Sequence, residues 1–371
     1  MNILTRLLKF TDSAIGPIIC SALSKSQTSA ETRTLSDFTG PILVIRPGGI
    51  GDAVMLLPTI RYLRSIVAPT TQIDILCETR NMELFKIAVS DVNLIVYDKS
   101  PIKTIRVLRQ RKYSVVIDTE QFHNFSGVMT GITGAELRVG FKVNTNRNGL
   151  YTHIVSYDFD GSEDAQFMRL INAVQPPPHS QPAKSGILSR YVSVPQFTLP
   201  HDIKQKEFLA LHAGGSIPCK QWMPERFAKV CDYVSDKYSL PTILIGGKSD
   251  CKQAEKICAA NSKPINLCGK LTLAETVSLC RQAKIFIGSD SGIAHIATAV
   301  DTPVVALFGP SDPNKWGVPK GTGSVIHNAL PCSPCSIFGY TKPCKNHECM
   351  LSISPEQVIT EVCKILENEI L

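Results

Sequence analysis

The sequence is poor in charged and aromatic residues and contains no long apolar run. Charged residues make up 19% of its 371 residues, below the roughly 25% of ordinary soluble domains, which argues against a disordered chain. No segment reaches the roughly 18 consecutive apolar residues that a membrane span needs. Lys plus Arg (39) exceed Asp plus Glu (32) by seven. This excess suits an anionic ligand or a membrane surface, but it is too scattered for nucleic-acid binding, which we do not expect.

The cysteine content indicates the cellular compartment, and the length indicates the number of domains. Thirteen cysteines without a recognisable secretory leader indicate a reducing, cytoplasmic compartment rather than a disulfide scaffold. A hydrophobic content of 43% over this length is enough for two domains, each with its own core.

Residues 1–40 form an N-terminal extension with a composition of its own. Apolar residues recur there at helical spacing, basic residues lie among them, and Gly16-Pro17 interrupts the run. The segment is too polar and too interrupted for a signal peptide. Two interpretations stay open: a basic amphipathic helix on an anionic bilayer, or a helix that docks on the protein's own core. The basic residues are Arg6, Lys9 and Lys25.

From Pro41 onward, short β-branched runs alternate with amphipathic stretches, the pattern of parallel sheets built from βαβ units. We therefore predict the α/β class, with two Rossmann-like doubly wound domains that face each other across a cleft. A proline-rich stretch between them reads as a linker, and an amphipathic helix closes the chain. The predicted segments are 41–175 for the first domain, 176–206 for the linker, 207–352 for the second domain and 353–371 for the closing helix.

A glycine-rich turn, Arg46 to Asp52, follows the first predicted strand and opens a helix. Such a turn lets backbone N–H groups approach an anion. The dinucleotide fingerprint is not met, because its third glycine position holds Val54. For Asp52 two readings are open: a helix cap, or a carboxylate at the strand end that accepts a proton. The glycines of this turn are Gly48, Gly49 and Gly51.

The second predicted domain contains two further glycine-containing turns that follow a strand and precede a helix. The stretch Gly214-Gly215-Ser216, followed by Lys220, offers backbone donors, a hydroxyl and a cation, which together suit a pyrophosphate. The other stretch, 288–295, lies between a buried strand and a helix, where Asp290 and Ser291 are good helix caps. His295 comes one helical turn after Ser291, on the same helix face, either as a structural residue or near a phosphate.

These motifs resemble the ADP-heptose:lipopolysaccharide heptosyltransferase family (glycosyltransferase family 9). The resemblance rests on RPGGIGD with the following LLP, on HAGGS with its lysine and tryptophan, and above all on SDSGIAHIATAVDTPVVALFGPSDPNKW at 289–316. It covers about residues 41–365. It implies a GT-B enzyme that transfers heptose from ADP-heptose to the lipopolysaccharide inner core with inversion, without a required cofactor, at the cytoplasmic face of the inner membrane.

The resemblance also implies roles for particular residues. Asp52 matches the proposed general base, and Gly215, Ser216 and Lys220 match the stretch that contacts the diphosphate. Asp290 matches the carboxylate that holds sugar hydroxyls, while Ser291 and Gly292 match the amides that meet the β-phosphate. Asp250 matches, weakly, an acidic partner of the ribose. The lipid-linked oligosaccharide acceptor would be recognised by residues between Thr119 and Gly140. These residues carry no recognisable motif.

A cysteine cluster lies near the end of the second domain: Cys332, Cys335, Cys344 and Cys349. A CxxC pair followed by two further cysteines is typical of a tetrahedral thiolate site for structural zinc. The alternative is a loop of reduced cysteines, and we do not expect a catalytic metal.

Two alternatives to heptosyl transfer stay open at this stage. One is a related GT-B transferase that uses another nucleotide sugar. The other is a metal-binding protein that kept the fold and lost the chemistry, although the presence of Asp52, Lys220 and Asp290 together argues against it.

Overall fold

The structure is a computed structural model that divides into two compact units, Met1–Pro182 and Ala183–Leu371. It describes residues 3–24, 33–175, 187–188, 196–200, 203–260, 264–337, 340–341, 344 and 346–367, and for residues 3–9, 340 and 341 the backbone only. Lys25 and most prolines of the predicted linker (Pro176, Pro177, Pro178, Pro182 and Pro195) lie outside these ranges. No helix in the described ranges is long and apolar enough to cross a bilayer.

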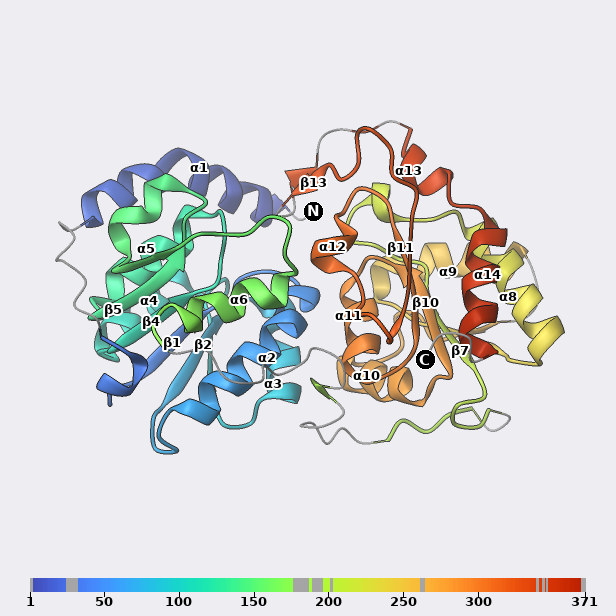
Figure 1. Ribbon diagram of the computed structural model, residues 1–371, viewed down its shortest axis with the longest axis horizontal. Helices are drawn as coiled ribbons and strands as arrows, with labels where there is room; N and C mark the ends of the chain where they lie inside the picture. The colour runs from blue at the N-terminus through green and yellow to red at the C-terminus, as the bar shows by residue number, and fades with distance from the viewer. Residues whose placement is uncertain are drawn as a thin grey trace. The chain divides into compact units, whose positions relative to one another are not determined.

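Unit 1 is built on a parallel six-stranded sheet with the order β3-β2-β1-β4-β5-β6. Helices cover both of its faces, as Figure 1 shows for α2 and α3 on one side and α5 on the other. Its strands are β1 (Ile42–Ile45), β2 (Ile73–Cys77), β3 (Asn93–Val96), β4 (Val115–Asp118), β5 (Leu137–Phe141) and β6 (His153–Val155). Its helices are α1 (Ile3–Leu23), α2 (Ile50–Ile66), α3 (Thr79–Ala88), α4 (Pro101–Gln110), α5 (Asn124–Thr133) and α6 (Glu163–Asn172), with short 3-10 turns η1 (Leu35–Asp37) and η2 (Thr145–Leu150).

Unit 2 repeats the architecture with the sheet order β12-β11-β10-β7-β8-β9, again parallel throughout. Its strands are β7 (Leu209–His212), β8 (Thr242–Leu244), β9 (Ile265–Asn266), β10 (Ile285–Ser289), β11 (Val304–Phe308) and β12 (Gly323–His327). Its helices are α8 (Pro224–Tyr238), α9 (Cys251–Ala260), α10 (Leu273–Gln282), α11 (Gly292–Ala299), α12 (Pro313–Trp316), α13 (Glu348–Leu351) and α14 (Pro355–Leu366). Short elements complete it: η3 (Pro218–Lys220), η4 (Lys248–Asp250) and the hairpin of β13 (Ser336–Ile337) and β14 (Tyr340–Thr341).

The central strands explain why the sequence folds in this way. Every residue of β1, β4, β7, β10 and β11 is buried, so these strands read as continuous apolar runs rather than as alternating ones. The predicted α/β class with two Rossmann-like parallel sheets is therefore confirmed. The division between the units falls at Pro182, within the proline-rich stretch 176–206.

The N-terminal extension forms the helix α1, and Gly16-Pro17, which interrupts the apolar run in the sequence, does not break this helix. The helix runs unbroken from Ile3 to Leu23 with Pro17 inside, although a proline in a helix interior costs about 3 kcal/mol or more. Packing offsets this cost, because α1 lies along α5 and η2 (Figure 1) and buries Cys20 against Val128 and Leu150. The expectation that this helix docks on the protein's own core is thus confirmed.

A buried carboxylate fixes how α1 docks on unit 1. The two oxygens of Asp12 accept the backbone N–H groups of Asn124 (3.1 Å) and Phe125 (2.6 Å). These groups open α5 and have no partner within that helix. Asp12 therefore caps a helix that lies more than one hundred residues further along the chain.

We expect Asp12→Ala to lower the free energy of unfolding by about 1–2 kcal/mol, because a lost helix cap costs about that much and leaves buried donors unsatisfied. Urea unfolding followed by circular dichroism measures the change. Ser13→Ala is the matched control, since Ser13 is exposed and bonds only within its own helix turn, and it should change stability by less than about 0.5 kcal/mol. Equal stability of both variants would contradict this role for Asp12.

Candidate functional site

In unit 1, the turn after β1 holds Asp52 in the first turn of α2. Its Oδ2 accepts the backbone N–H of Gly49 at 2.8 Å, so Asp52 does cap the helix, as one of the two sequence readings proposed. Gly48 adopts φ +124°, a conformation that favours glycine, and a Cβ there would lie 2.9 Å from Asp52 Oδ2. Gly51 lies inside α2. Asp52 keeps 27% of its side chain exposed.

Arg46, which the sequence reading did not single out, links this turn to the end of β4. Its Nη2 lies 3.5 Å from both Asp52 Oδ1 and Glu120 Oε2, and its Nη1 donates to the carbonyl of Thr119 at 2.9 Å. Burial by itself raises the pKa of the Glu120 carboxyl, but His123 at 2.9 Å and Arg46 outweigh it and hold that pKa below its usual range. A buried cation thus lies between two carboxylates at the carboxyl ends of β1 and β4.

In unit 2, Lys220 and Asp290 meet although 70 residues separate them. Lys220 Nζ donates to Asp290 Oδ2 at 2.6 Å, and His295 Nε2 lies 3.8 Å from Asp290 Oδ1. Burial raises the pKa of the Asp290 carboxyl, but Lys220 and His295 more than offset that effect and leave it below its usual value. Three residues predicted for the donor site therefore form one cluster.

The predicted phosphate-binding residues surround the start of α11 and the end of β7. Ser291 caps α11, accepting the backbone N–H of Ala294 at 3.4 Å, and Gly292 is the first residue of that helix. Gly215 and the exposed Ser216 lie between β7 and η3, the turn that carries Lys220. A helix N-terminus and a cation beside such a turn suit an anionic ligand.

His212 is the residue of this site that sequence reasoning missed. It ends β7, is buried, and lies between Ser291 Oγ (3.1 Å from Nδ1) and Asp250 Oδ2 (3.3 Å from Nε2). Burial raises the pKa of the Asp250 carboxyl, yet the contacts with His212 and with the Gly247 N–H leave it lowered. The signals in the sequence were the position of His212 between a strand and a glycine pair and its place at the start of the HAGGS motif, but neither gave it a role of its own.

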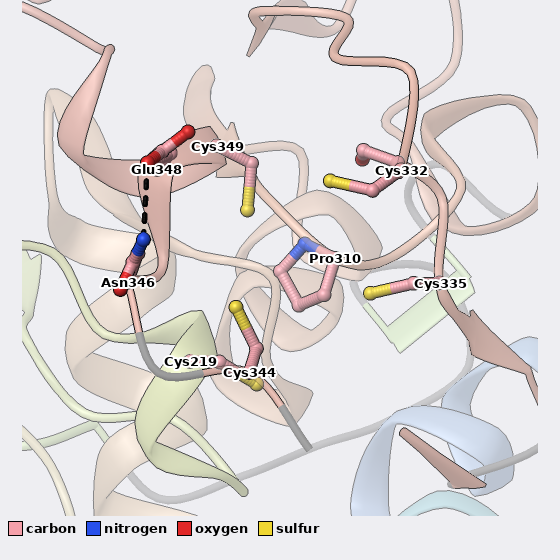
Figure 2. Close-up of a pocket in the computed structure, with 9 residues that line it drawn as sticks. Cys219, Pro310, Cys332, Cys335, Cys344, Asn346, Glu348 and Cys349 are labelled. Carbon is pink, nitrogen blue, oxygen red and sulfur yellow. Dashed lines mark hydrogen bonds between the residues drawn. The ribbon is translucent and has the colours of Figure 1, made fainter. Parts of the chain in front are cut away.

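The four cysteines of the predicted zinc site line one cavity of about 380 Å³, together with Cys219 of η3. Figure 2 shows the sulfur atoms of Cys332, Cys335, Cys344 and Cys349 turned toward the space beside Pro310. The backbone N–H of His347 points at Cys344 Sγ, 3.3 Å away. Within the described ranges, however, no three His, Cys, Asp or Glu side chains lie close enough together to hold a metal ion.

Comparisons with known proteins agree with this architecture. The family model for glycosyltransferase family 9 (heptosyltransferase) matches residues 102–346. Lipooligosaccharide heptosyltransferase 2 of Campylobacter jejuni is 33% identical over 171 residues, which is 43% of this chain and 52% of that protein. Lipopolysaccharide core heptosyltransferase OpsX of Haemophilus influenzae is 22% identical over 343 residues, 87% of this chain and 96% of that protein.

A solved structure shows the same fold. Escherichia coli ADP-heptose lps heptosyltransferase II superposes with a TM-score of 0.67 at 22% identity, covering 89% of this chain and 99% of that one. This likeness confirms the predicted GT-B fold class. The chain spans about half the length of the first curated relatives that it matches. Because the family model covers most of the sequence, the chain belongs to glycosyltransferase family 9, the heptosyltransferase family.

Proposed function

We propose that the protein transfers heptose from ADP-heptose to a sugar of the lipopolysaccharide inner core, with inversion at the anomeric carbon. The observation that carries this proposal is the cluster in unit 2. Lys220 and Asp290 form an ion pair of 2.6 Å there, and Asp290 comes directly before Ser291, the N-cap of α11. A lysine and preorganised amides stabilise a departing diphosphate without a metal ion, and such electrostatic effects are usually the largest single contribution to catalysis. Family membership and the curated heptosyltransferases support the substrate class.

In the proposed reaction, the acceptor hydroxyl attacks the anomeric carbon while the bond from that carbon to the β-phosphate oxygen breaks. The carboxylate of Asp52 takes the hydroxyl proton, and ADP leaves carrying the negative charge. Lys220 and the amides of Ser291 and Gly292 receive that charge, and Asp290 accepts hydrogen bonds from hydroxyl groups of the sugar. Arg46 keeps the Asp52 carboxylate in place at 3.5 Å.

We expect Asp52→Asn to lower kcat by a factor of about 10²–10⁴, the usual value of a general base. The dissociation constant for ADP should stay within about twofold of the wild-type value, because the asparagine oxygen still accepts the Gly49 N–H and preserves the helix cap. Transfer assays with ADP-heptose and a deacylated inner-core acceptor give kcat, and calorimetry gives the affinity for ADP. Turnover at the wild-type rate would remove Asp52 from the role of base.

A panel of ADP, UDP, GDP and CMP with their sugars, followed by thermal shift, separates ADP-heptose from other nucleotide sugars. We expect ADP and ADP-heptose alone to raise the melting temperature, and Lys220→Ala to weaken their binding by about tenfold or more, since it removes a charged partner of the diphosphate. A shift with another nucleotide would favour a related transferase. If none of these ligands raises the melting temperature, the result would favour a protein that kept the fold and lost the transferase activity.

We also propose that α1 brings the protein to the cytoplasmic face of the inner membrane, where a lipid-linked acceptor lies. Three apolar side chains of α1 are exposed: Phe10 is 69%, Ile15 48% and Ile18 68% exposed. Asp12, the only acidic residue among the first 30, is buried against α5 and adds no negative charge to the exposed surface of the helix. Apolar side chains on a basic segment are typical of helices that lie on anionic lipid.

We expect the protein to cosediment with vesicles that contain 30% phosphatidylglycerol, more weakly at high salt because salt screens the charges. The double variant Phe10→Ser/Ile18→Ser should lose at least about tenfold in partitioning, since each buried apolar side chain contributes about 1.5–3 kcal/mol. Ile102→Ser is the matched control, because Ile102 on α4 is 79% exposed as well and should leave binding unchanged. Loss of binding in the control, or none in the double variant, would contradict the role of α1.

The structural zinc site at Cys332, Cys335, Cys344 and Cys349 stays a prediction. Four thiolates suit zinc or iron, and bound metal would draw the four sulfur atoms closer around the cavity. We expect about one equivalent of zinc or iron per chain by mass spectrometry of protein purified without added metal. Cys344→Ser should lose that metal, whereas Cys258→Ser, at an exposed cysteine of α9, should keep it. Metal-free protein with four reactive thiols would show that these are reduced loop cysteines.

A further inference from the structure

His212 connects three neighbouring strands of the sheet in unit 2. It is the last residue of β7, whose neighbours are β8 on one side and β10 on the other. One ring nitrogen faces Asp250, which follows β8, and the other faces Ser291, which follows β10. The imidazole therefore lies at the centre of a chain of contacts that runs across the carboxyl edge of the sheet.

The chemistry of the end groups favours one direction for each of these hydrogen bonds. The Ala294 N–H can only donate, so the Ser291 oxygen accepts it, and the hydroxyl hydrogen remains available for Nδ1 of His212. Ionised Asp250 can only accept, so Nε2 carries the proton and donates to Oδ2. In the tautomer with its hydrogen on Nε2, His212 donates to Asp250 and accepts from Ser291, so both ring nitrogens are engaged.

The backbone packs closely around His212 at two glycines. A Cβ at Gly214 would lie 2.3 Å from Asp250 Oδ1 and 2.6 Å from His212 Nε2, and one at Gly288 would lie 2.9 Å from the His212 carbonyl. His212 itself is buried. Gly214 therefore lets the backbone approach the imidazole and Asp250 closely, and Gly288 lets it approach the His212 carbonyl.

We propose that His212 is a positioning residue of the donor site that holds the ribose partner and the phosphate-binding turn in register. The proposal rests on the proposed function, in which the Ser291 turn binds the diphosphate, and it adds to that function the role that the family resemblance implies for Asp250, the acidic partner of the ribose. His212 touches no reacting atom in this scheme. It acts on donor affinity through Asp250 on one side and through the N-cap of α11 on the other.

Two isosteric variants separate the two contacts. The amide oxygen of asparagine reaches the place of Nδ1 and accepts the Ser291 hydroxyl, so His212→Asn keeps the Ser291 contact and loses the Asp250 contact. The amide nitrogen of glutamine reaches the place of Nε2, so His212→Gln keeps Asp250 and loses Ser291. His327→Gln is the matched control, since His327 ends β12 in the same unit and bonds Ser333.

The readout is displacement of a fluorescent ADP analogue by ADP and by adenosine, with kcat at saturating ADP-heptose. We expect His212→Asn to weaken ADP and adenosine alike by about tenfold, because the loss of a hydrogen bond to a charged group costs about that much. We expect His212→Gln to weaken ADP similarly and leave adenosine within twofold. For both variants kcat should change less than about threefold, and His327→Gln should match the wild type.

The outcomes separate this inference from the proposed function. If both variants weaken both ligands equally and melt at the same lowered temperature, His212 is a structural residue only and the inference is wrong. Unchanged affinities would overturn it as well. If the wild-type protein binds ADP but transfers no heptose, the proposed function fails, whereas the binding test of His212 remains decisive.

Discussion

The candidate chemistry of both units depends on the place where the order of strands reverses. In each sheet, the first three strands of the unit follow one another toward one edge, and the fourth strand pairs with the other side of the first. The loops after the first and fourth strands therefore leave the sheet in opposite directions, which opens space at their carboxyl ends. Arg46 and Glu120 meet at that point in unit 1, and His212 and Ser291 meet there in unit 2.

Each unit places a cation among carboxylates at this point, and the burial of these charges argues for function rather than stability. Arg46 is almost fully buried beside the buried Glu120 and the partly exposed Asp52, and Lys220 is largely buried with Asp290. Removing such charges from water costs several kcal/mol, and apolar residues of similar size often fold at least as stably. Buried charges held at a loop edge are therefore better explained by a charged ligand than by stability, and in the proposed reaction that ligand is the diphosphate of the donor.

Much of the fold could be predicted from the sequence because its signals are local. The strands of the sheet centre are uninterrupted apolar runs, and glycine-rich turns mark their ends, so the α/β class and the Lys220–Asp290 region followed from the pattern. The continuity of α1 did not, because the docking that offsets Pro17 comes from α5, far along the chain. His212 was also missed. A histidine that ends a strand gains its role only when the sheet brings Asp250 and Ser291 to it, and pattern analysis along one chain does not measure that proximity.

The two readings of Asp52, helix cap and proton acceptor, are compatible, and a comparison with Asp12 shows why. Both carboxylates accept backbone N–H groups at the start of a helix. Asp12 uses each of its oxygens for an amide and is buried, so its role is structural. Asp52 uses Oδ2 for Gly49, leaves Oδ1 only a 3.5 Å contact with Arg46, and stays partly exposed. A carboxylate has about four acceptor positions. The cap therefore fixes the orientation of Asp52 while lone pairs remain available for an incoming hydroxyl, which is what a positioned base requires.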